Sequence, residues 1–169
     1  VPLDHKVPNI ERPRAWTIPY VGTFQIEKED PNRHFTVREI KTLTKAELIN
    51  LVKQRLADSR TFRNQSIVFI HGFNVSFEDA ARRTAQMAND LKLQGAPVFF
   101  SWPADKYFLL TYGKDETSVS WSAPHLKEFL LDLVHHTDAR AINLVGHSMG
   151  NRALTTALRE IDLQLRNEA

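Results

Sequence analysis

Cysteine is absent from this sequence, and long apolar runs and a strong charge of either sign are absent as well. Without cysteine the chain has no disulfide, no thiolate metal site and no cysteine nucleophile. No apolar run approaches the about 18 residues that a membrane-spanning helix needs. The formal net charge is only +2, and no block of Lys and Arg is present. We therefore expect neither a transmembrane segment nor a nucleic-acid partner.

What is present is the composition of an ordinary globular domain. Of the 169 residues, 42% are hydrophobic and 25% are charged, which is enough for one domain with its own core. Residues 1–19 are rich in proline and read as an extended lead-in. We expect residues 20–169 to form the N-terminal part of a single domain.

The first third of this domain predicts two strands and a helix. Two β-rich stretches, about 20–27 and 34–41, flank a turn at residues 30–32. Thr44 and Glu47 have capping-box spacing and predict a helix from there to about residue 57. Its expected apolar face consists of Leu48, Leu51, Val52 and Leu56.

Strands and helices then alternate. Short apolar runs at about 66–70, 97–102 and 141–145 predict buried strands. Helices are expected at about 76–94, from Pro124 to about 136, and at about 149–165, with a looser stretch before residue 122. Repeated β-α-β units of this length predict an α/β fold, a mostly parallel sheet with helices on both faces.

A nucleophile motif follows the third predicted strand: Gly146, His147, Ser148, Met149 and Gly150. In a Gly-x-Ser-x-Gly turn the serine projects from a sharp strand-to-helix bend whose crowded backbone requires glycine on both sides. Ser148 is the candidate nucleophile. The N–H of Met149 lies at a helix N-terminus, where it can stabilise a developing oxyanion.

A second motif follows the first of the three strands: His71, Gly72 and Phe73. The loop after this strand supplies the other oxyanion donor in an α/β-hydrolase. We therefore predict the N–H of Phe73 as the second donor, with Gly72 allowing a close approach of the backbone. No cofactor is implied. The adjacent His135 and His136 point about 100° apart on a helix, which argues against a shared metal ion.

These motifs carry a resemblance. Residues 68–83, 100–103 (Phe-Ser-Trp-Pro) and 146–152 are similar to a bacterial α/β-hydrolase family long catalogued as a domain of unknown function. The resemblance implies an α/β-hydrolase fold. Because the residues after Ser148 read as the helix behind the nucleophile, we expect this fold to be truncated after that helix. The resemblance also implies serine esterase or lipase-like activity, but it supplies no substrate. From the chemistry of the serine we expect an ester, thioester or similar acyl bond in a small-molecule or lipid-like substrate.

The acid and base of the expected catalytic triad are missing. In this fold they follow the serine in the order acid, then histidine, but no histidine follows Ser148. We expect both groups beyond residue 169, little turnover by this chain alone, and an exposed sheet edge that favours aggregation. His71 and His147 are not expected to act as bases. The remaining histidines are predicted to be solvated surface groups: His5, His34, His125, His135 and His136.

Two aromatic residues and the function itself each have more than one interpretation. Trp102 and Tyr112 could line an acyl pocket or simply pack. Arg82 and Arg83 are expected on the solvated face of a helix. As alternatives to a hydrolase, the parent protein could be a non-catalytic binding or scaffolding module, or an acyltransferase that uses the same machinery.

Overall fold

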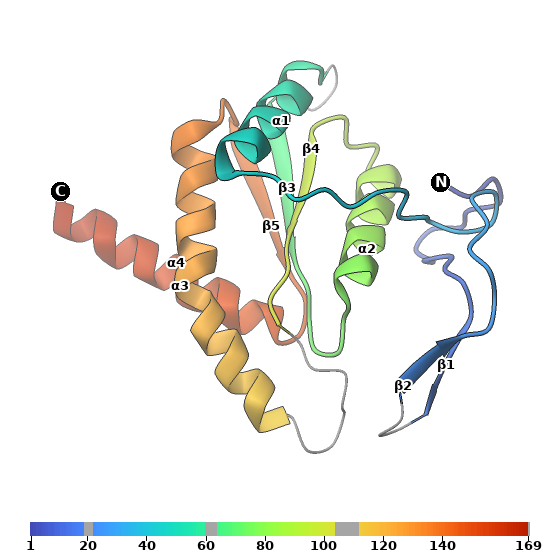
Figure 1. The fold of residues 1–169 in the computed structure, drawn as a ribbon. Coiled ribbons are helices and arrows are strands. Elements are labelled where there is room, and N and C mark those ends of the chain that lie inside the picture. Colours follow the sequence, from blue (N-terminus) through green and yellow to red (C-terminus); the bar gives the residue numbers. More distant parts are fainter. Residues whose placement is uncertain (19–21, 60–63, 104–111, 169) are drawn as a thin grey trace.

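A parallel three-stranded sheet forms the centre of the computed structural model, which describes residues 1–18, 22–59, 64–103 and 112–168 (Figure 1). Its strands are β3 (Gln65–Ile70), β4 (Ala96–Phe100) and β5 (Ala141–Gly146), in the order β4-β3-β5. Ile70 is paired with Phe100 on one side and with Gly146 on the other, so the three strands end at the same edge. The predicted parallel α/β fold is confirmed.

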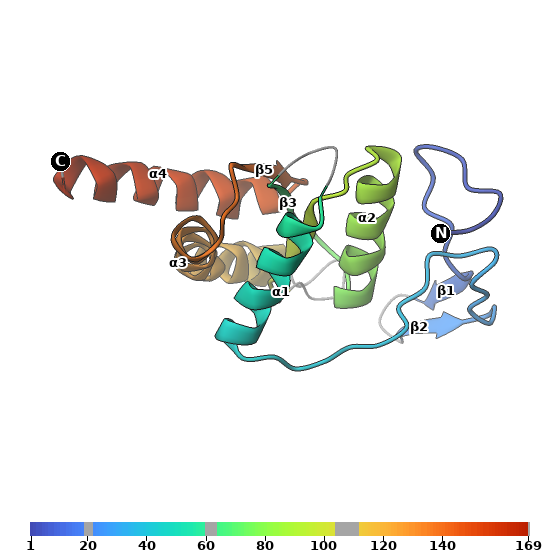
Figure 2. The same cartoon turned by 90° about the horizontal axis from the view of Figure 1, so that it is seen from above.

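Helices cover both faces of this sheet, as the top view shows (Figure 2). Neighbouring residues of a strand point to opposite faces. Val68 and Ile70 belong to one buried cluster with α1 (Lys45–Ala57), α3 (Tyr112–His136) and α4 (Gly150–Glu168). On the opposite face, Phe99 contacts Phe77 at the start of α2 (Phe77–Asp90), with 5.0 Å between ring centroids. Together the two layers bury the middle strand almost completely.

The helix α1 begins with the predicted capping box. The Thr44 hydroxyl accepts a hydrogen bond from the Glu47 amide, and the Glu47 carboxylate accepts one from the Thr44 amide at 2.7 Å. The buried face differs from the prediction, because Leu51 is exposed. The face that packs on the sheet is made of Ile49, Val52 and Leu56.

The N-terminal hairpin lies earlier in the chain than predicted. It pairs β1 (Ala15–Ile18) with β2 (Gly22–Gln25), apart from the main sheet (Figure 1). The strand predicted at 34–41 is wrong. The Phe35 amide donates to the Glu11 carbonyl, and the Phe35 carbonyl accepts from Arg82. The backbone of Phe35 is thus bound by two separate hydrogen bonds and not by the repeated hydrogen bonds that pair two strands.

The end of α2 also differs from the prediction. The helix ends at Asp90 rather than near residue 94, and Lys92 adopts the left-handed conformation with φ 52°. Gly95 therefore lies beyond the end of the helix. A Cβ on Gly95 would overlap the Gln65 carbonyl oxygen, so this glycine lets the chain enter β4 close to β3.

The helix α3 begins at Tyr112, not at Pro124, which lies inside it. Proline removes one helical hydrogen bond and bends a helix, and the helix changes direction partway along its length (Figure 1). The exposed proline ring is tolerated because Leu126 and Leu130, in the turns that follow, are fully or almost fully buried. Of the predicted looser stretch, residues 104–111 lie outside the described residues. Among the described helices none is long and apolar enough to span a membrane.

Candidate active site

Ser148 occupies a sharp turn between β5 and α4. It has φ 52°, a left-handed conformation that is unfavourable for a residue with a side chain. Backbone hydrogen bonds hold this turn in place. The His147 amide donates to the Ile70 carbonyl at 3.0 Å, and the Asn151 amide donates to the Ser148 carbonyl at 3.0 Å. The serine is exposed to solvent at the edge where the strands end.

Steric crowding explains why positions 146 and 150 of the motif are both glycine. A Cβ on Gly150 would overlap the carbonyl oxygens of Ile70 and His71, so only glycine lets α4 begin this close to β3. A Cβ on Gly146 would overlap the side-chain oxygen of Asn151. The turn is therefore compact because of its position against β3 and α4, which sequence spacing alone does not show.

The loop after β3 lies directly against this turn. A Cβ on Gly72 would come within 2.9 Å of Ser148 Cβ and 2.7 Å of His147 Nδ1. The two predicted motifs, more than 70 residues apart in sequence, are thus in contact. Phe73 is half-buried, and its side chain packs against the core. Its backbone N–H belongs to the peptide bond that joins it to Gly72.

The N–H of Met149 is placed at the start of α4. The amides of residues 150–152 each donate to the carbonyl three residues earlier. Within the part of the chain that the structure describes, the Met149 amide donates to no other group. This amide is thus available to an anionic oxygen beside Ser148.

A buried histidine and a buried tryptophan join the ends of β3 and β4. Nδ1 of His71 lies 2.9 Å from the Gly72 carbonyl oxygen, and Nε2 accepts from the Trp102 amide at 3.2 Å. The Trp102 indole stacks on the imidazole at 5.3 Å, and its N–H donates to the His71 carbonyl at 2.8 Å. Burial lowers the pKa of His71. Trp102 is 2% exposed and therefore packs in the core; the side chain of Tyr112 lies outside the described residues.

None of the described histidines hydrogen-bonds to Ser148. His125, His135 and His136 are exposed, as predicted. The prediction is wrong for the two N-terminal histidines, which are buried or almost buried. His34 accepts from the Asp30 amide through Nδ1 at 3.0 Å.

His5 lies between two carboxylates of different segments. Its ring nitrogens are 2.7 Å from Glu11 and 2.6 Å from Asp90. Hydrogen bonds to Asp90 and then to Glu11 raise the pKa of His5. These contacts of His5 attach the N-terminal segment to the last turn of α2.

Arg82 also departs from the prediction, because it is not on a solvated face. Its side chain is 14% exposed, and it pairs with Glu29 at 2.9 Å and Asp79 at 3.1 Å. Arg83 is half-buried and donates to Gln86. The N-terminal segment covers this side of α2, so a helix face that is polar in sequence becomes an ionic interface.

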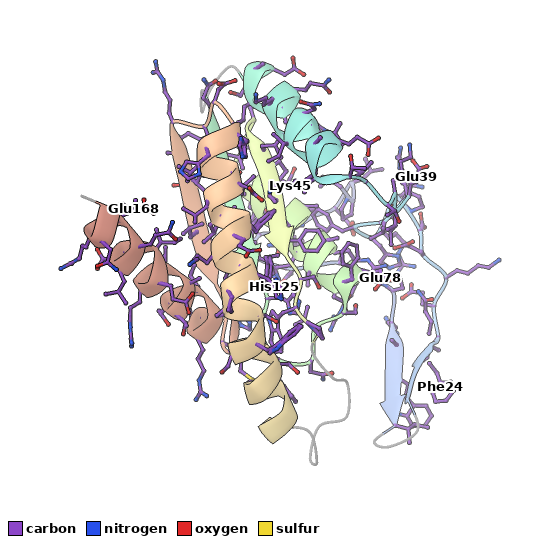
Figure 3. The ribbon with its side chains drawn as sticks, turned by 60° about the vertical axis from the view of Figure 1, so that its left-hand side comes forward. Phe24, Glu39, Lys45, Glu78, His125 and Glu168 are labelled. Carbon is purple, nitrogen blue, oxygen red and sulfur yellow. The ribbon has the colours of Figure 1, made fainter. Side chains whose placement is uncertain are left out.

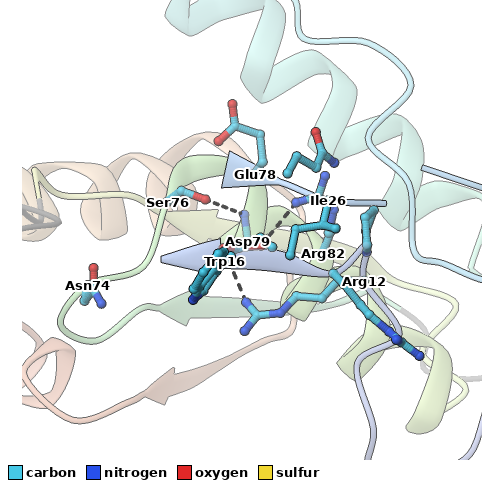
Figure 4. Close-up of a pocket in the computed structure, with 12 residues that line it drawn as sticks. Arg12, Trp16, Ile26, Asn74, Ser76, Glu78, Asp79 and Arg82 are labelled. Atoms are coloured by element: carbon cyan, nitrogen blue, oxygen red, sulfur yellow. Dashed lines mark hydrogen bonds and ion pairs between the residues drawn. The ribbon is translucent and has the colours of Figure 1, made fainter. Parts of the chain in front are cut away.

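A groove of about 870 Å³ lies between the hairpin and the first turn of α2 (Figure 4). Figure 3 labels Phe24 on the hairpin and Glu78 on α2, the two elements on either side. The groove reaches Asn74, in the same loop as Gly72. It is lined by Arg12, Pro13, Arg14, Ala15, Trp16, Gln25, Ile26, Asn74, Ser76, Glu78, Asp79 and Arg82. Among the described residues no cluster of three or more His, Asp or Glu side chains could hold a metal ion.

A parallel sheet with helices on both faces, and a turn-borne serine against the loop of the middle strand, define an α/β-hydrolase fold. The family described as alpha/beta hydrolase of unknown function (DUF900) matches residues 44–169. Since this match covers well over half of the sequence, the chain belongs to that family. Comparison with curated proteins and with solved structures gave no match.

Proposed function

We propose that this chain carries the nucleophile and the oxyanion hole of a serine hydrolase for ester or thioester bonds. The observation that carries the proposal is the conformation and position of Ser148. This residue has a left-handed backbone, is exposed to solvent and lies against Gly72. A strained residue at the ligand-binding edge of an α/β sheet is typical of a nucleophile. The substrate is a small-molecule or lipid-like acyl ester.

In the proposed reaction Ser148 Oγ attacks the acyl carbonyl carbon while a base takes the hydroxyl proton. The carbonyl oxygen becomes an oxyanion, which accepts hydrogen bonds from the Phe73 and Met149 amides. The intermediate expels the alcohol or thiol, which takes up the proton. Water then releases the acid from the acyl-enzyme and restores Ser148.

Among the described residues no histidine is positioned to act as the base for Ser148. Ser148 Oγ makes no hydrogen bond to any described histidine, and the Nδ1 and Nε2 atoms of His71 are both occupied. Without a base, such a site keeps only the residual effect of the oxyanion hole and binding. The 169-residue chain alone should therefore turn over esters slowly.

The test is covalent labelling with a fluorophosphonate probe, using protein expressed from the complete reading frame. We expect labelling of one peptide, the one that contains Ser148, and its loss in Ser148→Ala. Ser120→Ala, an exposed serine on α3, is the matched control and should label normally. Labelling that survives Ser148→Ala would refute the proposal. A non-catalytic module would give no labelling, and an acyltransferase would label but pass the acyl group to an added alcohol.

A further inference from the structure

We infer that His71 and Trp102 act together as positioning residues, fixing the peptide between Gly72 and Phe73 so that its N–H serves the oxyanion hole. This inference rests on the proposed function, because it gives a role to two buried side chains only if Ser148 reacts. It excludes His71 as the general base and makes the stacked tryptophan part of the site's support.

The hydrogen-bond partners of His71 determine its protonation state. A carbonyl oxygen cannot donate, so Nδ1 must carry a proton to bond with Gly72. The Trp102 amide donates, so Nε2 must present its lone pair. The imidazole is therefore neutral with its proton on Nδ1, and burial, which disfavours the charged form, supports this state.

The bond to Gly72 fixes the direction of the next amide. In a planar trans peptide the N–H points opposite to the carbonyl of the preceding residue. The Gly72 carbonyl points toward the buried imidazole, so the Phe73 N–H points in the opposite direction within the same peptide plane, away from the imidazole. Gly72 itself lies against Ser148, which puts this amide next to the nucleophile.

Trp102 holds the imidazole from the neighbouring strand. Its ring plane lies within 10° of the imidazole plane, and its indole N–H bonds to the His71 carbonyl. Trp102 thus contacts His71 through its backbone amide, its ring face and its indole N–H. His71 is 0% exposed. An imidazole held at so many points cannot rotate without breaking several buried contacts, so the Gly72 carbonyl is held as well.

Two substitutions separate positioning from packing. In His71→Asn the amide nitrogen can replace Nδ1 and donate to Gly72, but nothing reaches the Trp102 amide. In His71→Gln the amide oxygen can replace Nε2 and accept from Trp102, but the Gly72 carbonyl loses its donor. His71→Gln leaves the Gly72 carbonyl without this donor, and His71→Asn leaves the Trp102 amide and the Ser101 hydroxyl, 3.1 Å from Nε2, without their common partner. We therefore expect a decrease in Tm for both variants.

Their effects on Ser148 should differ. Misplacing an oxyanion donor by about 1 Å costs on the order of 100-fold in rate. We expect the second-order rate constant for fluorophosphonate labelling to fall about 100-fold in His71→Gln and less than about 10-fold in His71→Asn. With an ester substrate the loss in His71→Gln should appear in kcat and leave KM nearly unchanged.

Trp102→Phe keeps a stacked ring and removes the indole N–H, and we expect labelling about 10-fold slower. Trp121→Phe is the matched control, because Trp121 is 72% exposed on α3 and should leave the rate unchanged. Should both His71 variants fail to fold, Trp102→Phe and long-range 1H–15N spectra of the wild-type imidazole decide. A proton on Nε2 of His71 in those spectra would overturn the inference.

The remaining outcomes are distinguishable. Equal rates in His71→Gln and wild type, or equal losses in His71→Gln and His71→Asn, would overturn the positioning role and leave the proposed function intact. No labelling of Ser148 in the wild-type protein would refute the proposed function, and with it any catalytic meaning of the two side chains.

Discussion

The replacement of Gly150 by alanine tests whether the approach of α4 to β3 sets the reactivity of Ser148. The added Cβ would overlap the carbonyl oxygens of Ile70 and His71. Both are backbone atoms of the central strand and cannot rotate away. The start of α4, two residues after the serine, must therefore move outward by about 1 Å to restore van der Waals distance.

The magnitude follows from two opposed terms. Overpacking costs about 1–3 kcal/mol, whereas alanine in place of glycine in a helix contributes at most about 1 kcal/mol in the other direction. We expect a net loss of about 1–2 kcal/mol, or about 2–8 °C in Tm for a chain of this size. A displacement of about 1 Å at the nucleophile costs on the order of 100-fold in rate. The reactive site should therefore suffer more than the fold.

Two measurements on the same variant check this, the Tm from calorimetry and the rate of fluorophosphonate labelling. Thr156→Ala, on the exposed face of α4, is the control and should change neither by much. If Gly150→Ala labels at the wild-type rate, the close approach of α4 does not position Ser148. A large loss of Tm with an unchanged rate per folded molecule would lead to the same conclusion.

Three further predictions concern the core, the N-terminal segment and the groove. Leu126→Ala, at a fully buried site, should cost about 3–4 kcal/mol and lower the Tm by about 10 °C; a change below about 2 °C would contradict the packing. Hydrogen bonds to Asp90 and Glu11 raise the pKa of His5, so these contacts stabilise the folded state fully below the unfolded pKa of about 6.5. The stabilisation is lost as pH rises through the folded pKa. Limited proteolysis of residues 1–14 should therefore accelerate with rising pH in wild type and be fast and pH-independent in His5→Ala; faster cleavage at lower pH in this window would be the opposite result. Trp16→Ala should raise KM for an acyl ester about 2- to 10-fold with kcat unchanged if the groove binds the non-reacting part of the substrate; an unchanged KM would remove the groove from the substrate path.

Three of the departures from the sequence predictions share one origin, the packing of the N-terminal segment. The strand expected at 34–41 is absent because the backbone of Phe35 is bound by Glu11 and Arg82, which are distant in sequence. Arg82 and His5 leave the surface because the N-terminal segment packs on α2 and supplies their counter-charges. No local sequence pattern predicts such pairings, because each of these charged side chains, taken alone, belongs to a residue type that is usually exposed to solvent.

From residue 44 onward the sequence by itself determined the order of the strands and helices, the parallel sheet and the place of the serine turn. These follow from local causes: apolar runs of strand length, capping residues, and glycines at Gly146 and Gly150 on either side of Ser148. Only the tertiary structure decided why those glycines are required, and that Gly72 contacts Ser148 and Trp102 stacks on His71. These contacts arise where three strands end at one edge, and their distances depend on how the sheet and α4 pack rather than on any spacing along the chain.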